Sequence, residues 1–177
     1  TSIVATDLNE PMVRHAEAIG TVRPVKWRTA DAMLLPFSDE SFDAVVCQFG
    51  VMFFPNRAAA FREARRVLCP GGAFVFSAWD RIEENHFADV VTRSLQPLFS
   101  DPPTFLRRVP HGYHDTGAIA ADLAAAGFDS AATISTVTAP SRADSPQAVA
   151  IAYCLGTPLR NEIESRDPAA LGKATEV

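Results

Sequence analysis

The sequence predicts an α/β domain with a Rossmann-like, doubly wound and mostly parallel sheet, and three observations lead to this prediction. Apolar runs of strand length alternate with amphipathic helical stretches between residues 3 and 79. The apolar runs are continuous, as expected for a parallel sheet that is covered on both faces. A polar or acidic residue follows each run, at the position where open α/β sheets bind ligands.

The composition limits the class of protein. The chain has 177 residues, of which 47% are hydrophobic and 21% charged, so we expect a globular domain with a sizeable core. The net charge is −5 without a Lys/Arg run, which argues against nucleic acid as the main partner. No apolar run approaches the roughly 20 residues of a membrane span. The three cysteines have no metal-ligand spacing, so we expect no metal site and a cytoplasmic location.

The first predicted strand covers Ile3–Thr6 and leads into a helix. Asn9 is a good helix N-cap residue, and Pro11 fits the first turn, where its missing N–H is not needed. Gly20 can end this helix because glycine readily adopts the backbone conformation found after a helix. The residues expected on the inner face of the helix are Met12, Ala16 and Ile19.

Three further strands are predicted in the first half of the chain, with right-handed parallel crossovers. Alternation over Val25–Thr29 predicts one strand, and the apolar run Phe42–Cys47 predicts the next. Asn56 is the expected N-cap of the following helix. The Pro-Gly pair at 70–71 signals a type II turn before a strand over Ala73–Trp79. The expected inner face of the helix is Phe61, Ala64, Val67 and Leu68.

The second half of the chain is expected to be mainly helical. The elements predicted here are a helix over Asn85–Leu95, an irregular segment over Gln96–Tyr113, a helix from Asp115 or Thr116 to Gly127, a strand over Ala131–Thr138, and two helices that begin at Ser145 and Pro158. The first of these helices should direct its apolar side chains inward, namely Phe87, Val90, Val91 and Leu95.

Two acidic residues directly follow predicted strands and could bind a nucleoside. The Asp7 carboxylate could accept both hydroxyls of a ribose, although an aspartate here could also serve only as a turn or capping residue. Asp31 could accept the exocyclic amine of adenine, while the backbone N–H of Ala32 offers a donor. Met33 and Leu34 could then pack on the purine ring. The alternative for Asp31 is an Asx turn.

Aromatic side chains end the next two strands. Gln48 and Phe49 follow the strand that begins at Phe42, where they could face a ligand, although Phe49 could equally be a core residue. Trp79 ends the following strand and could form the wall of a pocket or lie at the rim of the core.

Histidine and tyrosine side chains cluster in the segment expected to be irregular. His111, Tyr113 and His114 are candidates for a general base, because histidine titrates near neutral pH. The alternative is that they are polar surface residues of a loop. His86 has the same two interpretations, and His15 is expected to face solvent.

Four segments, in this order, together resemble class I S-adenosylmethionine-dependent methyltransferases. The similarity is greatest to the small-molecule, type 11-like group, which includes quinone and lipid methyltransferases, and it covers about residues 1–80. The segments are 3–12 (Ile-Val-Ala-Thr-Asp-Leu-Asn-Glu-Pro-Met), 30–37 (Ala-Asp-Ala-Met-Leu-Leu-Pro-Phe), 41–46 (Ser-Phe-Asp-Ala-Val-Val) and 65–72 (Arg-Arg-Val-Leu-Cys-Pro-Gly-Gly).

The resemblance implies a function and a set of binding residues. It implies methyl transfer from S-adenosylmethionine to a small-molecule acceptor, on a seven-stranded sheet whose last strand is antiparallel. Asp7 with its neighbour Leu8 would hold the ribose of the cofactor. Asp31, with Ala32 and Met33, would hold the adenine, and the methionine end would pass the two residues after the third predicted strand, Gln48 and Phe49.

The resemblance also implies a division of the chain. We expect a single methyltransferase-like domain over 1–177, with a cofactor-binding half (1–80), a substrate lid (81–114) and C-terminal helices with one strand (115–177). The first strand and Gly-rich loop of such enzymes have no counterpart here, so we expect them before Thr1 in a longer protein. Their last, antiparallel strand is expected after Val177.

Two other functions are compatible with parts of the sequence. A nicotinamide-dependent Rossmann oxidoreductase could use Asp7 in the same way, but the sequence has no Tyr-x-x-x-Lys pattern for hydride transfer. A non-catalytic methyltransferase-like domain would bind the cofactor or a partner without turnover.

Overall fold

The computed structural model describes residues 2–128 and 132–176, which form two compact units. The first, here called the sheet unit, consists of Thr1–Cys47, Phe54–Phe76 and Ala120–Ala132. The second, the helical unit, consists of Gln48–Phe53, Ser77–Ile119 and Thr133–Val177. The α/β class is confirmed. The division of a single domain into cofactor, lid and C-terminal parts stays a prediction.

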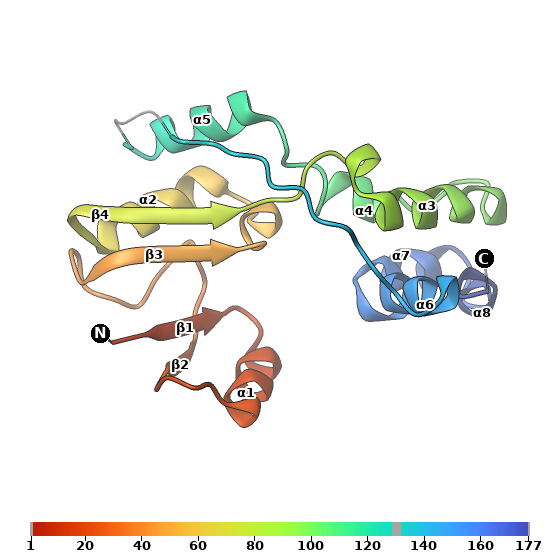
Figure 1. Cartoon of the computed structure of the whole chain (residues 1–177), viewed down its shortest axis with the longest axis horizontal. Coiled ribbons are helices and arrows are strands. Elements are labelled where there is room, and N and C mark those ends of the chain that lie inside the picture. Colours follow the sequence, from red (N-terminus) through yellow and green to blue (C-terminus); the bar gives the residue numbers. More distant parts are fainter. Residues whose placement is uncertain (1, 129–131, 177) are drawn as a thin grey trace. The chain divides into compact units, whose positions relative to one another are not determined.

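The sheet unit begins with a β-α-β element. Strand β1 (Val4–Asp7) pairs in parallel with β2 (Lys26–Thr29), and helix α1 (Glu10–Ile19) connects them (Figure 1). The register places Val4 opposite Lys26 and Asp7 opposite Thr29. Both predicted strands are therefore present to within one residue at each end.

The ends of α1 are as predicted, but its buried face is not. The side chain of Asn9 accepts a hydrogen bond from the Met12 N–H, Pro11 lies in the first turn, and Gly20 follows the helix with a φ of 75°. Val13 is the buried residue, whereas Met12 is 57% exposed. Ile19, also expected inside, is 73% exposed. The two short strands that pack against α1 are long enough to bury only Val13. The other apolar side chains of the helix, Met12 and Ile19, therefore stay exposed to solvent.

A second pair of strands completes the sheet unit. Strands β3 (Phe42–Gln48) and β4 (Leu68–Ser77) pair and run in the same direction, and helix α2 (Arg57–Val67) connects them (Figure 1). Strand β4 starts earlier than predicted, because the Pro-Gly pair lies inside it. Gly71 has the positive φ, 80°, that a type II turn requires. A Cβ at Gly72 would lie 2.9 Å from the Cys69 carbonyl oxygen, so only glycine fits there.

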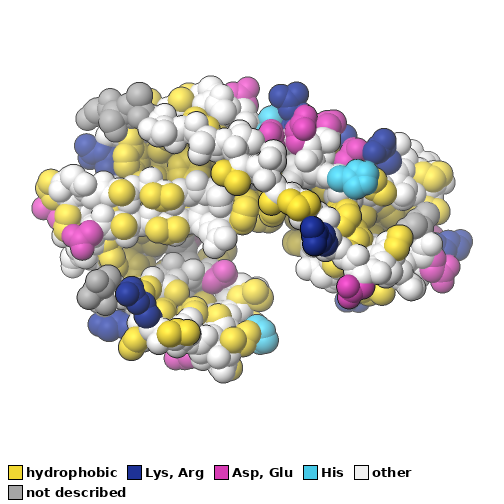
Figure 2. Space-filling model, in the orientation of Figure 1, with side chains coloured by type: hydrophobic (Ala, Val, Ile, Leu, Met, Phe, Trp, Pro, Cys, Tyr) yellow, Lys and Arg dark blue, Asp and Glu magenta, His cyan; other side chains and the backbone are white. Residues whose placement is uncertain are grey.

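The expectation that the strands are buried on both faces is wrong. No residue of β1 or β3 is buried, and Val46 and Val75 are 70% and 55% exposed. Figure 2 shows hydrophobic side chains at the surface of this part of the chain. The reason is that the described strands form two separate pairs, and α2 covers the face of β4 that carries Phe74 and Phe76. The face that carries Val75 is therefore open.

Helix α2 supplies the core of the sheet unit, as predicted. Asn56 caps it by accepting a hydrogen bond from the Ala59 N–H at 2.9 Å. Phe61 is fully buried, and its ring centroid lies 5.2 Å from those of Phe74 and Phe76. Ala64, Val67 and Leu68 are also buried.

Arg66 fastens the loop after β2 to helix α2. Its guanidinium donates hydrogen bonds to the carbonyl oxygens of Leu35 and Phe37, at 2.9 and 2.8 Å. It also pairs with the carboxylates of Asp39 and Glu63. Glu63 in turn accepts a bond from the Leu35 N–H at 2.8 Å. The hydrogen bond from Arg66 lowers the pKa of Glu63, so both groups are charged near neutral pH.

Replacing Arg66 should loosen this loop. In Arg66→Gln the shorter amide cannot reach both carbonyl oxygens and both carboxylates, so we expect faster hydrogen exchange at the Leu35 N–H. Arg62→Gln is the control, because Arg62 is an exposed residue of the same helix. Hydrogen-exchange mass spectrometry measures the effect. Equal exchange in the two variants would show that Arg66 does not hold the loop.

The helical unit contains most of the remaining elements. These are η1 (Val51–Phe53), η2 (Ile82–Glu84), α3 (His86–Leu95), η3 (Gln96–Leu98), α4 (Phe105–Arg108), the start of α5 (Thr116–Ala125), α6 (Pro146–Gly156), α7 (Leu159–Arg166) and α8 (Ala170–Ala174). A buried cluster from α3, α4, α6, α7 and α8 forms its core, with Leu95, Leu159 and Ile163 almost fully buried.

The predicted helix starts and stops in this half are confirmed. The Asp115 carboxylate accepts a bond from the Ala118 N–H at the start of α5, and Gly127 follows the helix with a φ of 85°. Ser145 caps α6 by accepting a bond from the Ala148 N–H at 3.1 Å. The inner residues Ile119 and Leu123 of α5 are buried. Helix α7 begins directly after Pro158.

Three predictions in this half are wrong in part or in full. The segment Gln96–Tyr113 is not wholly irregular, since it contains η3 and α4. In α3, Val90 is 39% exposed, and Ala88 and Thr92 are buried instead. The predicted strand Ala131–Thr138 has no regular structure over its described residues 132–138, because no neighbouring strand pairs with them. Residue 131 lies outside the described residues.

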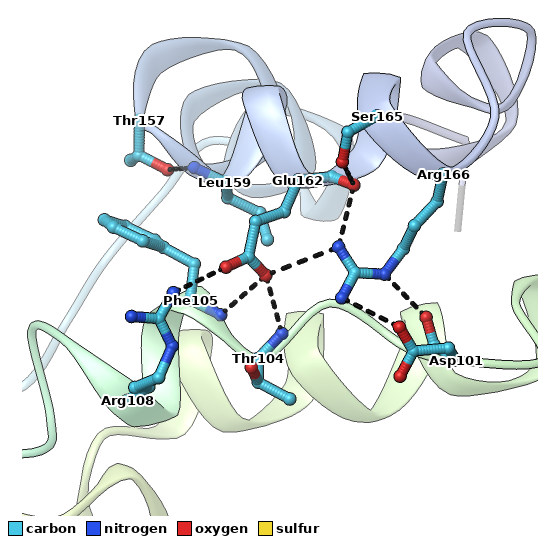
Figure 3. A network of polar contacts seen from close by, with 9 residues as sticks. All are labelled: Asp101, Thr104, Phe105, Arg108, Thr157, Leu159, Glu162, Ser165 and Arg166. Carbon is cyan, nitrogen blue, oxygen red and sulfur yellow. Dashed lines mark hydrogen bonds and ion pairs between the residues drawn. The ribbon is translucent and has the colours of Figure 1, made fainter.

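Glu162 joins helix α7 to the start of α4 (Figure 3). Its Oε2 accepts hydrogen bonds from the backbone N–H groups of Thr104 and Phe105, at 2.9 and 3.1 Å. Its Oε1 accepts a bond from Arg108 at 2.8 Å. Burial raises the pKa of Glu162, but these hydrogen bonds outweigh it and lower the pKa overall. Arg166 extends the network from Glu162 to Asp101.

Removing the Glu162 carboxylate should destabilise the helical unit. Glu162→Ala leaves two N–H groups at the start of α4 without their acceptor, and loss of such a cap costs about 1–2 kcal/mol. Glu164→Ala is the matched control, because Glu164 lies on the same helix and pairs only with Arg160 among the contacts described. Urea unfolding measures both variants. Equal stability would mean that Glu162 does not anchor α4.

Candidate functional site

Asp7 lies at the carboxyl end of β1, in the sheet unit. Its Oδ1 accepts a hydrogen bond from the Asn9 N–H at 2.7 Å, which closes a turn before α1. Its backbone oxygen accepts a bond from the Ala30 N–H at 3.0 Å, so the chain after β2 runs alongside it. Asp7 itself is exposed. The local turn predicted as an alternative is therefore present, and it holds the carboxylate at the end of the strand.

Asp31 lies at the same edge as Asp7. Thr29 is the register partner of Asp7, and Asp31 lies two residues after Thr29. Because neighbouring strands lie about 5 Å apart, Asp31 is close to the end of β1. Its Oδ1 accepts a bond from the Met33 N–H at 2.8 Å, so the Asx turn is present. The bond from the Ala30 N–H to the Asp7 carbonyl oxygen places the residue before Asp31 directly beside the end of β1.

Apolar side chains accompany both acids. Leu8 is 70% exposed and Leu34 is 77% exposed, whereas Ala32 and Met33 are half-buried. Exposed leucines beside fixed carboxylates give this edge both an apolar surface and hydrogen-bond acceptors. The edge can therefore offer contacts to a ligand that has both a flat apolar ring and hydroxyl or amino groups.

A second group of candidate residues lies in the helical unit, where Phe49 follows β3. Phe49 has a φ of 52°, a left-handed conformation that is uncommon for an aromatic residue. Its N–H donates to the Ser77 carbonyl oxygen at 3.2 Å and lies 3.1 Å from the Ser77 hydroxyl oxygen. Its ring stacks on Trp79, with centroids 4.1 Å apart and planes 13° apart. Gln48 is exposed, Phe49 is half-buried, and Trp79 is 42% exposed.

His111 lies beside this aromatic pair and is only 5% exposed. Its ring centroid is 6.2 Å from that of Trp79, and its Nδ1 is 2.9 Å from the Asp80 carbonyl oxygen. Because a carbonyl oxygen can only accept, Nδ1 carries the hydrogen of this bond. Burial lowers the pKa of His111, which favours the neutral ring.

The expectation that the histidine segment is merely a polar surface loop is wrong for two of its three residues. His111 and Tyr113 are buried, at 5% and 4% exposure. His114 is exposed, and its Nδ1 is 2.9 Å from the His111 carbonyl oxygen. His86 and His15 are also exposed. The structure therefore brings His111, rather than His114, next to the aromatic pair.

Sequence reasoning missed the groups that fix these residues. The Asp80 carbonyl oxygen that orients His111 lies 31 residues earlier in the chain. A backbone carbonyl leaves no trace in residue types, so no sequence signal identifies it. The ion pair of Glu63 and Arg66 does have a weak signal, since the two residues lie at helical i, i+3 spacing.

The lowered pKa of His111 predicts how stability depends on pH. The unfolded side chain titrates near 6.5, and the folded one at a lower pH. The unfolded state therefore binds more protons between these values, and stability should be full above 6.5 and fall as the pH drops toward the folded pKa. Carboxylates whose pKa is lowered, such as Glu63, make the stability depend on pH only below about pH 4.5.

We therefore expect the thermal midpoint of the wild type to drop between pH 7.5 and 5.5, and the drop to shrink in His111→Gln. His86→Gln should behave as the wild type, because His86 is exposed. Calorimetric scans at a series of pH values measure this. The same pH dependence in all three proteins would contradict the burial of a neutral histidine at 111.

Comparison with known proteins identifies the family that the first part of the chain resembles. Residues 1–76 match the methyltransferase domain. This match includes Asp7, Asp31 and the strand pairs of the sheet unit. It ends before Trp79 and His111.

Curated relatives match a similar share of the chain. The ubiquinone/menaquinone biosynthesis C-methyltransferase UbiE of Rickettsia felis is 34% identical over 92 residues, which cover 50% of this chain and 37% of the relative. The protein of the same name from Rickettsia prowazekii is 35% identical over the same shares. The matched part of the chain thus spans little more than a third of these relatives.

Solved structures agree in fold. A putative methyltransferase from Bacillus halodurans is 27% identical with a TM-score of 0.50, over 72% of this chain and 53% of its own. The YcgJ protein of Bacillus subtilis is 23% identical with a TM-score of 0.50, over 71% of this chain and 51% of its own. The second likeness shows a shared fold alone.

The predicted resemblance to class I S-adenosylmethionine-dependent methyltransferases and the predicted Rossmann-like fold are therefore confirmed. S-adenosylmethionine is the cofactor that the match to the methyltransferase domain implies. The family match and the curated relatives give no support to a nicotinamide-dependent oxidoreductase or to a non-catalytic domain. Among the described residues, no helix is both long and apolar enough to cross a membrane.

Proposed function

We propose that this protein transfers a methyl group from S-adenosylmethionine to a small-molecule acceptor. The observation that carries the proposal is the position of Asp7 and Asp31 at one edge of the β1–β2 pair, inside the stretch that matches the methyltransferase domain. Two carboxylates at the ends of neighbouring parallel strands suit a nucleoside, because one can accept from ribose hydroxyls and the other from an exocyclic amine.

The residues present fit an adenosine group. Each carboxylate uses Oδ1 in its own turn, to Asn9 or to Met33, and a carboxylate has a second oxygen that can accept from a ligand. In this proposal Asp7 and Leu8 contact the ribose. The adenine is held by the next segment of this edge, Asp31, Ala32 and Met33.

A contact of Gln48 and Phe49 with the methionine end of the cofactor stays a prediction from the resemblance. Both residues belong to the helical unit, where Phe49 has a left-handed backbone, a conformation that is concentrated at ligand sites. The bound cofactor supplies a methyl group activated by a positively charged sulfur. The protein contributes by holding the acceptor atom in line with that methyl group, which replaces a collision in solution by a fixed geometry.

The acceptor and the location are also proposals. A small-molecule acceptor is supported by the matched family and by a net charge of −5, which does not favour a nucleic acid. A cytoplasmic location is supported by the cysteines: all three lie in the described part of the chain, and none forms a disulfide.

The adenine contact can be tested without disturbing the turn. Asp31→Asn keeps a side-chain oxygen for the Met33 N–H but removes the charge and places a donor toward the exocyclic amine. We expect binding of S-adenosylmethionine to weaken by about 1–3 kcal/mol, the value of a hydrogen bond to a charged group. Titration calorimetry measures this change.

Asp39→Asn is the control, because Asp39 lies in the same loop and pairs with Arg66. It should bind the cofactor as the wild type does. Absence of binding by the wild type would reject the proposed function. Equal binding by Asp31→Asn and Asp39→Asn would reject the role of Asp31 alone.

A further inference from the structure

We infer that the Glu63–Arg66 ion pair of helix α2 sets the preference of the cofactor edge for adenine, because it positions the loop that carries Asp31. This inference rests on the proposed binding of S-adenosylmethionine. It adds two positioning residues, which act through the loop rather than through contact with the ligand. All of the residues involved belong to the sheet unit.

The loop after β2 is fixed at its start by backbone bonds. The Ala30 N–H donates to the Asp7 carbonyl oxygen at 3.0 Å, which joins the entry of the loop to the end of β1. Asp31 then closes a tight turn, in which its Oδ1 accepts a bond from the Met33 N–H and its carbonyl oxygen accepts one from the Leu34 N–H at 3.0 Å. Both of these bonds lie inside the turn. They fix its shape, but they do not fix the position from which the chain leaves it.

Helix α2 holds the residue at which the chain leaves this turn, Leu35. The Leu35 N–H donates to Glu63 Oε2 at 2.8 Å, and the Leu35 carbonyl oxygen accepts a bond from Arg66 Nη2 at 2.9 Å. Both backbone polar groups of Leu35 are therefore bound by side chains of one helix, much as a neighbouring strand would bind them. Arg66 Nη1 also donates to the Phe37 carbonyl oxygen at 2.8 Å. The exit of the turn is thus held at two residues.

The two side chains of α2 also hold each other. Arg66 donates from Nε to Glu63 Oε1 at 2.7 Å and from Nη2 to Glu63 Oε2 at 2.8 Å, the paired geometry that a guanidinium makes with a carboxylate. These hydrogen bonds lower the pKa of Glu63 and raise the pKa of Arg66, so both groups are charged near neutral pH. The same helix carries the buried core residues Phe61 and Val67. The loop is therefore anchored to a charged pair on a well-packed helix.

The other side-chain contacts of this loop are more exposed. Arg28 of β2 donates to the Pro36 carbonyl oxygen at 3.2 Å, and Asp39 pairs with Arg66. The side chains of Arg28 and Asp39 are both exposed, and solvent screens charges there, so such contacts contribute little. The side chain of Glu63, by contrast, is mostly buried. We therefore assign the position of the loop to Glu63 and Arg66.

The position of the loop matters for one half of the ligand. A hydrogen bond weakens steeply when its distance or angle departs from the optimum, so the Asp31 carboxylate must meet the exocyclic amine closely. Asp7, which would bind the ribose, is held by its own bond to the Asn9 N–H. A displaced loop would therefore lose the adenine contact and keep the ribose contact. Loss of the ion pair should lower the selectivity for adenine in addition to the overall affinity.

Two ligands that differ at the base measure this selectivity. S-adenosylhomocysteine carries the exocyclic amine, and S-inosylhomocysteine carries in its place a carbonyl oxygen, which a carboxylate repels. The wild type should prefer the adenine compound by about 10- to 100-fold, the value of a hydrogen bond to a charged group. Titration calorimetry gives both dissociation constants, and their ratio is the readout. Because a smaller folded fraction weakens both compounds equally, a merely structural defect does not change the ratio.

Arg66→Gln should lower this ratio by about threefold or more, since residues of one hydrogen-bond network commonly couple by this amount. Glu63→Gln is the second variant, in case the first does not fold. It retains an acceptor for the Leu35 N–H but loses the ion pair, so it should lower the ratio as well. Arg62→Gln changes an exposed residue of the same helix and should keep the wild-type ratio.

A double variant tests whether the ion pair acts through Asp31. Once Asp31→Asn has removed the charge that recognises the amine, adding Arg66→Gln should lower the ratio no further. A further loss of preference in the double variant would show that Arg66 acts through another residue and would overturn the inference.

An unchanged ratio in a folded variant of Arg66 or Glu63 would also overturn the inference. So would a wild type that binds the two compounds equally, since this edge would then not select adenine. In both cases S-adenosylhomocysteine still binds to the wild type, and the proposed function stands. A wild type that binds neither compound shows instead that the proposed function has failed.

Discussion

The parallel pairing of β1 with β2 is the constraint on which the candidate cofactor site depends. Asp7 and Asp31 lie far apart in the sequence, and only the register of Asp7 with Thr29 brings them to one edge. A parallel pair needs a crossover, which α1 supplies between Asn9 and Gly20. A shift of the register by one residue would send the side chains of β2 to the opposite faces. The short helix and its two caps therefore matter for binding although they contain none of the proposed contacts.

The sequence was most informative where structure is local. Cap residues such as Asn9, Asn56 and Ser145 act on N–H groups within three residues, so their roles could be predicted from residue type and spacing. The order of strands and helices in the first half followed from the same kind of signal. The candidate acids were also found in this way, because a carboxylate directly after a strand is visible in the sequence alone.

Burial and long-range contacts could not be predicted in the same way. Val46 and Met12 are apolar and were expected inside, yet whether a side chain is buried depends on what covers it, and the described strands form only two pairs. The segment 132–138 alternates like a strand, but none of the described strands pairs with it. The partner of His111 is a backbone oxygen, which every residue carries, so neither its burial nor its tautomer could be inferred.

The turns at Asp7 and Asp31 have a further consequence for how a ligand would be recognised. In each turn the side chain is already locked by a bond from its own backbone, to the N–H of Asn9 or Met33. A surface carboxylate normally loses rotamer freedom when it binds a ligand, at a free energy cost of order 0.5–1.5 kcal/mol per side chain. Here the two side chains already lose this freedom when the protein folds. Association at this edge would then require little rearrangement of the two acids, so it should be fast, and selectivity would come from shape rather than from induced closure.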